Sequence, residues 1–226
     1  MKNIFRENGK KITVYTNDDV SGPVPHVFIN EYAGDGSGVW KELENKGAFC
    51  ALTVISDVDW DNDLTPWECP PVFPGDGTYK GKADEHCDFI TGTVIPKTDE
   101  MIGEKASYYA STGYSLAGLF ALYTAYRSDV FSRFASMSGS LWYPGFIEFA
   151  QEHDFSARPD FIYLSLGDRE AKTRNATVSK VQENTEKYYE LIKQAGIASV
   201  LQMNPGNHYK DIDKRTAAGI MCMLKG

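Results

Sequence analysis

The sequence predicts an α/β protein in which a mainly parallel sheet is covered by helices on both faces. Strand-like and helix-like segments alternate along the 226 residues, and parallel strands are joined by helical crossovers in this way. The segment 48–56, AFCALTVIS, is a long apolar run typical of a strand buried on both faces. The segment 116–127, LAGLFALYTAYR, is apolar nearly all round, as expected of a helix packed deep against a sheet.

The remaining elements follow in chain order from local composition. Residues 10–16 are rich in β-branched side chains and bounded by Gly9 and Asn17, and 26–30 is a short apolar run before a glycine-rich loop. We expect further strands at 106–112, 133–140, 161–168 and 199–204, and helices at 39–47, about 84–103, 176–195 and 210–225. Segment 57–82 is irregular, and long loops in compact domains are more often functional. With no linker or repeat, we expect a single domain over residues 1–226.

Composition excludes several classes of function. A hydrophobic content of 42% and an aromatic content of 13% indicate a globular protein. The net charge of −8 disfavours nucleic acid as a partner, and the sequence contains no basic amphipathic stretch for a membrane surface. We expect no transmembrane helix and no signal peptide. The four cysteines are scattered without a C-x-x-C pair, which favours reduced thiols in a cytoplasmic protein.

A serine follows the strand predicted at 106–112, in the stretch Gly113-Tyr114-Ser115-Leu116-Ala117-Gly118. The nucleophile pattern Gly-x-Ser-x-Gly places its serine on a tight strand-to-helix turn. Here the second glycine comes one residue late, so the pattern alone leaves two interpretations open, a nucleophile and an ordinary turn serine. A base, an acid and an oxyanion hole elsewhere in the chain are needed to decide between them.

His208 is the candidate base, because of the four histidines it alone lies in a loop between a late strand and the final helix. We expect His86 and His153 on helix surfaces and His26 in a structural role. The acid should follow the strand at 161–168, where both Asp168 and Glu170 are candidates. The order serine, acid, histidine is that of α/β-hydrolases.

The oxyanion hole needs two backbone N–H donors near the serine. Leu116, directly after Ser115, is the first candidate. The glycine-rich segment NEYAGDGSG after residue 30 suggests the second, with Ala33 preferred and Tyr32 as the alternative. Tyr32, Trp67, Tyr114 and Trp142 are candidates to line a substrate pocket.

These residues together resemble the putative esterase family of α/β-hydrolases, which includes esterase D-like, feruloyl and acetylxylan esterases and enterochelin-type siderophore esterases. The resemblance covers most of the chain, in VFINEYAGDGSGVW, DNDLTPWECPP, GKADEH, TGYSLAGLFALY, SMSGSLWYP, SLGDRE and GNHY. It implies Glu170 as the acid, because in this family the acid commonly falls on the third residue after a glycine such as Gly167. Ala117 departs from the glycine that many members carry.

The resemblance implies a serine carboxylic ester hydrolase without cofactor or metal. Its substrate would be a small-molecule or carbohydrate ester, such as a sugar, hydroxycinnamoyl or siderophore ester, chosen by segment 57–82 and the loop around Trp142. An acyltransferase of the same fold is the close alternative, and a non-catalytic binding domain is a second.

Segment 57–68, DVDWDNDLTPWE, also resembles a calcium-binding EF-hand loop in the spacing of its acids. Asn62 stands where that loop needs glycine, and Pro66 interrupts it. We therefore interpret the acids as the rim of a pocket and expect no metal site.

Overall fold

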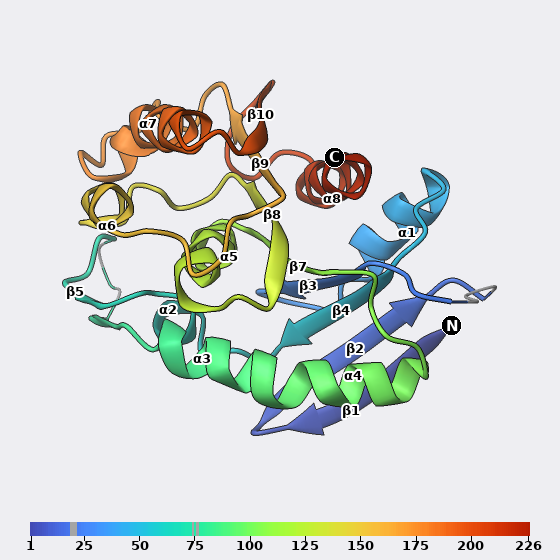
Figure 1. The fold of residues 1–226 in the computed structure, drawn as a ribbon. Helices are drawn as coiled ribbons and strands as arrows, with labels where there is room; N and C mark the ends of the chain where they lie inside the picture. The colour runs from blue at the N-terminus through green and yellow to red at the C-terminus, as the bar shows by residue number, and fades with distance from the viewer. Residues whose placement is uncertain (19–21, 74, 76) are drawn as a thin grey trace.

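The computed structural model describes residues 1–18, 22–73, 75 and 77–226. Within them, eight strands form one sheet in the order β1-β2-β4-β3-β7-β8-β9-β10 (Figure 1). Strands β3, β4, β7, β8, β9 and β10 run parallel, whereas β1 and β2 are antiparallel to their neighbours. The strand bounds are β1 Lys2–Glu7, β2 Lys10–Thr16, β3 His26–Asn30, β4 Ala51–Ser56, β7 Tyr109–Tyr114, β8 Phe131–Met137, β9 Phe161–Gly167 and β10 Ala198–Asn204.

Helices cover both faces of this sheet, as predicted (Figure 1). On one face lie α1 (Ser37–Asn45) and α8 (Ile212–Lys225), whose apolar side chains share one core cluster with the strands. A second cluster joins the other face to five further helices, which are α3 Ala83–Phe89, α4 Ile95–Ile102, α5 Leu116–Arg127, α6 Phe146–Glu152 and α7 Val181–Gln194. Because α5 is buried all round, its near-continuous apolar sequence is explained by its central place in this second layer.

Two elements outside segment 57–82 were not predicted from the sequence. Strand β1 pairs with β2 through a tight turn at Asn8 and Gly9, both of which have positive φ, at 49° and 79°. An Asn-Gly pair with these angles is the favoured two-residue hairpin turn, so this signal was available. The second missed element is α6, and its short length of 7 residues gives little periodicity to read.

The helix predicted near 84–103 is a composite of three segments. Between α3 and α4 the chain widens into a π-helical stretch, Ile90–Val94, followed by Pro96 in the first turn of α4. Proline has no N–H to donate to the preceding turn, and a π-helical stretch is a common way for a helix to absorb such a break. Segment 57–82 likewise contains more structure than expected, namely α2 (Trp60–Asp63) and a short hairpin of β5 (Glu68–Cys69) and β6 (Tyr79–Lys80).

The carboxyl ends of the parallel strands meet at one edge of the sheet. Asn30 of β3 pairs in register with Gly113 of β7, which pairs with Ser136 of β8. Gly167 of β9 is opposite Asn204 of β10. The loops after these strands therefore lie together, which is where α/β sheets collect their functional groups.

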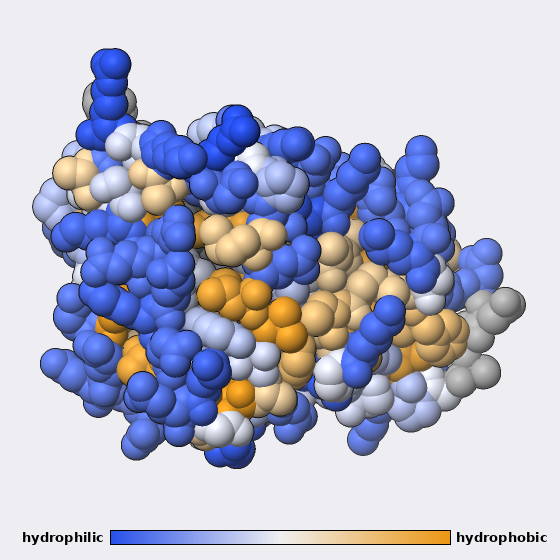
Figure 2. All heavy atoms as spheres, turned by 90° about the horizontal axis from the view of Figure 1, so that it is seen from above, coloured by the Kyte–Doolittle hydropathy of each residue, from blue (hydrophilic) through white to orange (hydrophobic). Residues whose placement is uncertain are grey.

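The face of the molecule seen in Figure 2 is mostly hydrophilic, as the globular composition of the sequence predicts, with apolar side chains gathered near its middle. No helix in the part of the chain that the structure describes is long and apolar enough to cross a bilayer. Cys50, Cys69, Cys87 and Cys222 are all free thiols.

Candidate active site

Ser115 occupies a strained turn between the end of β7 and the start of α5. Its φ of 60° with ψ of −124° is a conformation that residues with a Cβ rarely adopt. The turn is held by hydrogen bonds from Ser115 N to Met137 O at 3.2 Å and from Ser140 N to Ser115 O at 3.0 Å. The loop after β8 therefore supports this serine, whose hydroxyl also lies 3.4 Å from the hydroxyl of Ser140.

The displaced glycine of the motif has a steric explanation. A Cβ on Gly113 would lie 2.2 Å from the carbonyl oxygen of Ala117, so only glycine fits there. With Gly113 bare, the methyl group of Ala117 is accommodated and fully buried. Gly118 serves a different contact, because a Cβ there would lie 3.0 Å from the Cα of Gly139 in the loop after β8. The departure at Ala117 thus leaves the turn intact.

A chain of contacts joins Ser115 to His208 and Glu170. The Nε2 atom of His208 is 3.1 Å from Ser115 Oγ, and its Nδ1 atom is 2.8 Å from Glu170 Oε2. The other carboxylate oxygen, Oε1, accepts hydrogen bonds from Ser138 Oγ and from the N–H of Gly167, both at 2.6 Å. Burial alone would raise the pKa of Glu170, but the hydrogen bonds from His208 and Ser138 outweigh it and lower that pKa below its usual value.

Asp168, the alternative acid, points elsewhere. Its Oδ1 atom accepts the N–H of Gly206 at 2.8 Å and so joins the loop after β9 to the loop after β10. The first residue after Gly167 therefore makes a turn contact, as aspartate often does, while the third, Glu170, reaches the imidazole. Of the two candidates, the structure brings only Glu170 to His208.

Two further residues fix the His208 loop. Arg215 of α8 is buried and donates to the carbonyl oxygens of Pro205 and Asn207, at 3.2 and 3.1 Å, and to Glu170 Oε1 at 3.4 Å. The hydroxyl of Tyr114 donates to the carbonyl of His208 at 2.6 Å.

Arg215 was missed from the sequence, because nothing in its place on an amphipathic helix distinguishes it from a surface arginine. Ser138 was missed too, although it directly follows the end of β8.

The candidate oxyanion donors differ in their surroundings. The N–H of Leu116, at the first position of α5, has no hydrogen-bond acceptor among the residues that the structure describes, as expected at a helix N-terminus. The backbone N–H groups of Tyr32 and Ala33 lie close to the carboxyl group of Glu31 and act to lower its pKa. Burial, with the charges of Asp213 and Asp35, raises the pKa of Glu31 to about 7. The N–H of Leu116 is therefore open to a ligand, whereas those of Ala33 and Tyr32 lie beside an acidic side chain.

A sequence model described as "Putative esterase" matches residues 40–211, which is more than half of the chain. The chain belongs to the Putative esterase family. The esterase is thus a carboxylic ester hydrolase, and the resemblance seen in its motifs is confirmed. The matched range includes Ser115, Glu170 and His208 but begins after the segment that contains Tyr32 and Ala33.

Solved structures share the fold of the esterase at low sequence identity. An IroE-like serine hydrolase from Shewanella oneidensis has a TM-score of 0.79 at 14% identity, covering 100% of this chain and 80% of the other. The siderophore hydrolase EstA from Aspergillus nidulans has a TM-score of 0.69 at 19% identity, with 100% and 93% covered. The enterobactin esterase FES from Shigella flexneri has a TM-score of 0.69 at 16% identity, with 99% and 57% covered. A sequence search of curated proteins gives no match. The predicted α/β-hydrolase fold is confirmed.

The four aromatic residues predicted for the substrate pocket fall into different settings. Tyr32 is exposed and packs edge-on against Trp60 at 5.2 Å. Trp142 is buried against Phe73, whose ring is 5.7 Å away and partly exposed. Trp67 packs among core rings and donates to Pro144 O at 2.9 Å, and Tyr114 is turned toward the His208 backbone.

The remaining histidines lie outside this constellation. His26 is fully buried at the start of β3, and His153 is exposed just after α6. The expectation that His86 lies on a helix surface is wrong, since it is 3% exposed and its Nε2 atom lies 2.7 Å from Asn30 Oδ1. The face of α3 that carries His86 packs against β3 and α5, where Phe120 contacts its ring.

The acids of segment 57–68 have separate partners rather than a common centre. Asp57 pairs with Arg6 at 3.0 Å and Asp63 with Lys10 at 2.8 Å, while Asp59 accepts the side-chain amide of Asn62. Helix α2 occupies the middle of the segment, which is incompatible with an EF-hand loop. Across the described ranges of the chain, no group of three or more His, Cys, Asp or Glu residues is arranged to hold a metal ion.

Proposed function

We propose that the esterase cleaves its substrate through a covalent acyl-enzyme, with Ser115 as nucleophile, His208 as base and Glu170 as the orienting acid. The observation that carries the proposal is the unbroken contact chain from Ser115 Oγ to His208 Nε2 at 3.1 Å and from His208 Nδ1 to Glu170 Oε2 at 2.8 Å. The imidazole in the middle can accept a proton from the hydroxyl while the carboxylate fixes its tautomer.

The reaction follows from this order. Ser115 Oγ attacks the ester carbonyl carbon as its proton passes to His208 Nε2, and the carbonyl oxygen becomes an oxyanion. The tetrahedral intermediate collapses, and His208 returns the proton to the departing alcohol, leaving Ser115 acylated. Water then repeats the two steps and releases the acid. The lowered pKa of Glu170 keeps its carboxylate charged, so that it stabilises the imidazolium formed in each step.

The oxyanion needs donors in place before the attack. The open N–H of Leu116 supplies the first. We take the N–H of Ala33 as the second donor, with that of Tyr32 as the alternative on the same segment.

The substrate we propose is a small-molecule or carbohydrate ester, in the range of sugar, hydroxycinnamoyl and siderophore esters. Solved relatives of the same fold are named as siderophore hydrolases and as a ferulic acid esterase. Tyr32, Trp67, Tyr114 and Trp142 remain the rings that we propose for contact with an aromatic or sugar group, and of these Tyr32 is exposed. Free thiols at all four cysteines favour a reducing compartment such as the cytoplasm.

Labelling with a fluorophosphonate probe tests the nucleophile. The wild type should be labelled and Ser115→Ala should not. Ser140→Ala is the matched control, because its hydroxyl lies 3.4 Å from that of Ser115 yet does not contact His208. Label that persists in Ser115→Ala would reject Ser115 as the nucleophile, and a wild type without label or ester turnover would favour a non-catalytic binding domain.

The fate of the acyl group separates a hydrolase from an acyltransferase. The wild type is given short acyl nitrophenyl esters, methyl ferulate, acetylated xylan and a siderophore trilactone, each with and without an added alcohol. Release of free acid as the main product supports the hydrolase. Predominant transfer to the alcohol would reassign the chain to the acyltransferases, since the same acyl-enzyme serves both reactions.

A further inference from the structure

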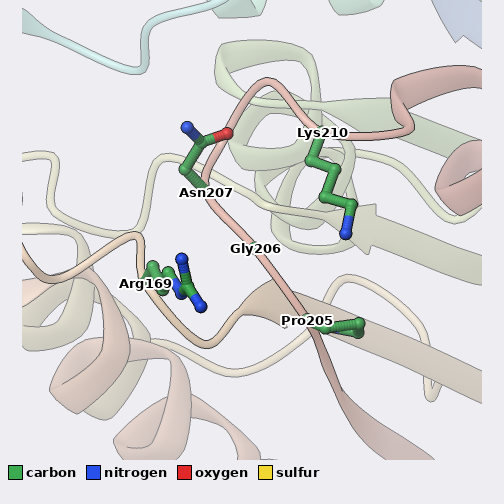
Figure 3. Close-up of a pocket in the computed structure, with 5 residues that line it drawn as sticks. All are labelled: Arg169, Pro205, Gly206, Asn207 and Lys210. Atoms are coloured by element: carbon green, nitrogen blue, oxygen red, sulfur yellow. The ribbon is translucent and has the colours of Figure 1, made fainter.

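A cavity of about 350 Å³ opens beside the His208 loop, lined by Arg169, Pro205, Gly206, Asn207 and Lys210. Figure 3 shows Arg169 on one side of the segment 205–207 and Lys210 on the other. We call this cavity the Arg169–Lys210 notch. Two cations line it, although the chain as a whole has a net charge of −8.

Both cations are set in place by Gly206. The backbone N–H of Arg169 donates to Gly206 O at 3.1 Å. The stem of Lys210 lies across the glycine, since a Cβ there would come within 2.5 Å of Lys210 Cδ. The φ of Gly206, +118°, also requires glycine. The absence of a side chain at 206 thus leaves room for the stem of Lys210.

The notch offers hydrogen-bond donors and hides its acceptors. The carbonyl oxygens of Pro205 and Asn207 are bound by Arg215, and that of Gly206 by Arg169 N. The side-chain oxygen of Asn207 accepts Tyr209 N, which leaves its amide nitrogen as a donor. In the described residues, neither the guanidinium of Arg169 nor the ammonium of Lys210 has an ion-pair partner.

The nearest acid does not neutralise the notch. Asp168 directs its Oδ1 atom to the N–H of Gly206 at 2.8 Å and forms no ion pair with Arg169 within the described residues. Glu170 is buried and directs its two carboxylate oxygens to His208 and Arg215. A group that fills the notch therefore meets two positive charges and an amide donor, which is the chemistry that binds a carboxylate or a phosphate.

The notch is close to the reacting atoms. Gly206 is two residues from His208, so their Cα atoms are at most about 7.6 Å apart. His208 Nε2 is in turn 3.1 Å from Ser115 Oγ. The notch therefore lies beside the loop that carries His208, and an anionic group of an ester bound at Ser115 meets the notch where the ester extends over this loop.

We propose that the Arg169–Lys210 notch binds a carboxylate or phosphate group carried by the ester substrate, which makes the enzyme selective for anionic esters. The inference rests on the proposed function, because it assumes that the ester is cleaved at Ser115. It narrows the substrate from esters in general to esters that carry a negative charge near the scissile bond.

The test compares esters that differ only in charge. 4-Nitrophenyl butyrate and 4-nitrophenyl hemisuccinate form a pair with the charge in the acyl part. Propyl acetate, 3-acetoxypropanoate and 2-acetoxyethyl phosphate carry no charge, a carboxylate and a phosphate in the alcohol part. The variant Arg169→Gln/Lys210→Met should lower the anionic-to-neutral ratio of kcat/KM about tenfold for at least one set, which is the size expected for losing charge-assisted hydrogen bonds. Lys172→Met, an exposed cation of the same loop outside the notch, is the matched control and should not change the ratio.

Binding is measured apart from turnover by titrating Ser115→Ala calorimetrically with monoethyl succinate and with diethyl succinate. Tighter binding of the monoester that is lost in Ser115→Ala/Arg169→Gln/Lys210→Met supports the notch. Equal ratios in wild type and notch variant, for every ester set, would overturn the proposal. So would protection of the wild type against heat by inorganic phosphate without any preference for anionic esters, which would assign the notch to a free anion. Failure of the wild type to hydrolyse any ester would instead overturn the proposed function, and the titration would still decide whether the notch binds anions.

Discussion

The two edges of the sheet each hold a histidine, a carboxylate and a hydroxyl, but in a different order. At the carboxyl edge, the imidazole of His208 lies between the Ser115 hydroxyl and the Glu170 carboxylate. At the amino edge, the carboxylate of Asp99 lies between His26, 2.9 Å away, and the Tyr109 hydroxyl. Only an imidazole in the middle can take a proton from the hydroxyl and share its second N–H with the carboxylate. The composition of a cluster is therefore a weaker guide to chemistry than its order.

Exposure and strain separate the two edges further. His26 is fully buried, and its Nδ1 atom is not aligned for a hydrogen bond with Asp99. The His208 side chain is 30% exposed, and Ser115 is strained at positive φ. Burial raises the pKa of Tyr109 to about 12, and its hydrogen bond with Asp99 adds to this, so the phenol stays protonated. The amino edge thus has the groups of a catalytic site in a closed structural cluster.

Substitution of the hydroxyls should give the largest contrast between the edges. Ser115→Ala or His208→Ala should lower kcat by several orders of magnitude, as removal of either group does in a well-studied protease. Tyr109→Phe, which removes the amino-edge hydroxyl, should leave kcat within a few-fold of wild type. Nitrophenyl acetate hydrolysis with folding checked by circular dichroism measures both. A large loss of kcat in a folded Tyr109→Phe would break the contrast.

The second-largest difference in kcat is expected between variants of Glu170 and Asp168, the two acids in the loop after β9. Glu170→Gln should lower kcat by up to about 10⁴, because an orienting carboxylate in the same role contributes that much in a protease. Asp168→Asn keeps a side-chain oxygen for Gly206 N–H and should change kcat little. Both variants are measured on one ester. If Asp168→Asn were the more damaging of the two, the acid would be reassigned to Asp168.

Arg215 should act on the site through Glu170 and the His208 loop. Arg215→Gln should destabilise the fold by about 3 kcal/mol, since removing one partner of a buried ion pair leaves the other uncompensated. Loss of this cation also favours protonation of the Glu170 carboxylate. The pH at which half of the activity is lost should therefore move upward. Urea denaturation and a pH profile measure the two effects. Arg215→Lys, which keeps the charge, should restore the pH profile more fully than the stability.

The stability of the two edges should depend on acid in separate pH windows. Burial lowers the pKa of His26, although the charge of Asp99 acts in the opposite direction. As the pH drops below about 6.5, the imidazole is protonated in the unfolded chain before it is protonated in the folded one, so the free energy of unfolding falls. The fold lowers the pKa of Glu170 from the ordinary glutamate value of about 4.5. Its contribution to the free energy of unfolding is therefore present above about pH 4.5 and is lost only as the pH falls below that value.

Unfolding free energies of His26→Asn and Glu170→Gln across this range locate the windows. His26→Asn should flatten the curve from pH 6.5 downward, and Glu170→Gln only below about pH 4.5. His153→Gln, at an exposed site, serves as the control and should follow the wild type. Identical curves for His26→Asn and wild type would remove His26 from this account.

Ala117→Gly should have the smallest effect. It should cost about 1 kcal/mol of stability, because glycine is less favourable than alanine in a helix, and change kcat within about threefold. Gly113→Ala is the contrasting variant and should disrupt the turn, since its methyl group would overlap the carbonyl of Ala117. The comparison is made by thermal unfolding and by turnover of the same ester.

The sequence was a good guide where one local signal decides the structure. Strand β4 and helix α5 were predicted because long apolar runs report burial directly, and the antiparallel β1 was missed because its residues are mostly exposed. Ser115, His208 and Glu170 were candidates because their loops follow strand ends. Their mutual distances depend on strand order, with β8 and β9 between β7 and β10, which no local pattern contains.

The supporting residues show the limit of local signals most clearly. Arg215 is 45 residues from Glu170 and belongs to an ordinary amphipathic helix. Glu31 could be seen beside Ala33, but the burial and the nearby acids that raise its pKa could not. The contacts that tune the site are long-range, whereas the contacts that make each element are local.

The close contact between Gly113 and Ala117 leaves room for only one methyl group, and this constrains how the turn can change over evolutionary time. A lineage that carries glycine at both positions can gain the methyl group at 117, because position 113 stays bare. The reverse path, a methyl group gained at 113, is blocked by the backbone carbonyl of residue 117 whatever side chain stands there. The two glycines of the motif are therefore unequal under mutation, and the first should be retained long after the second has drifted. Searches that demand both will overlook sequences such as this one.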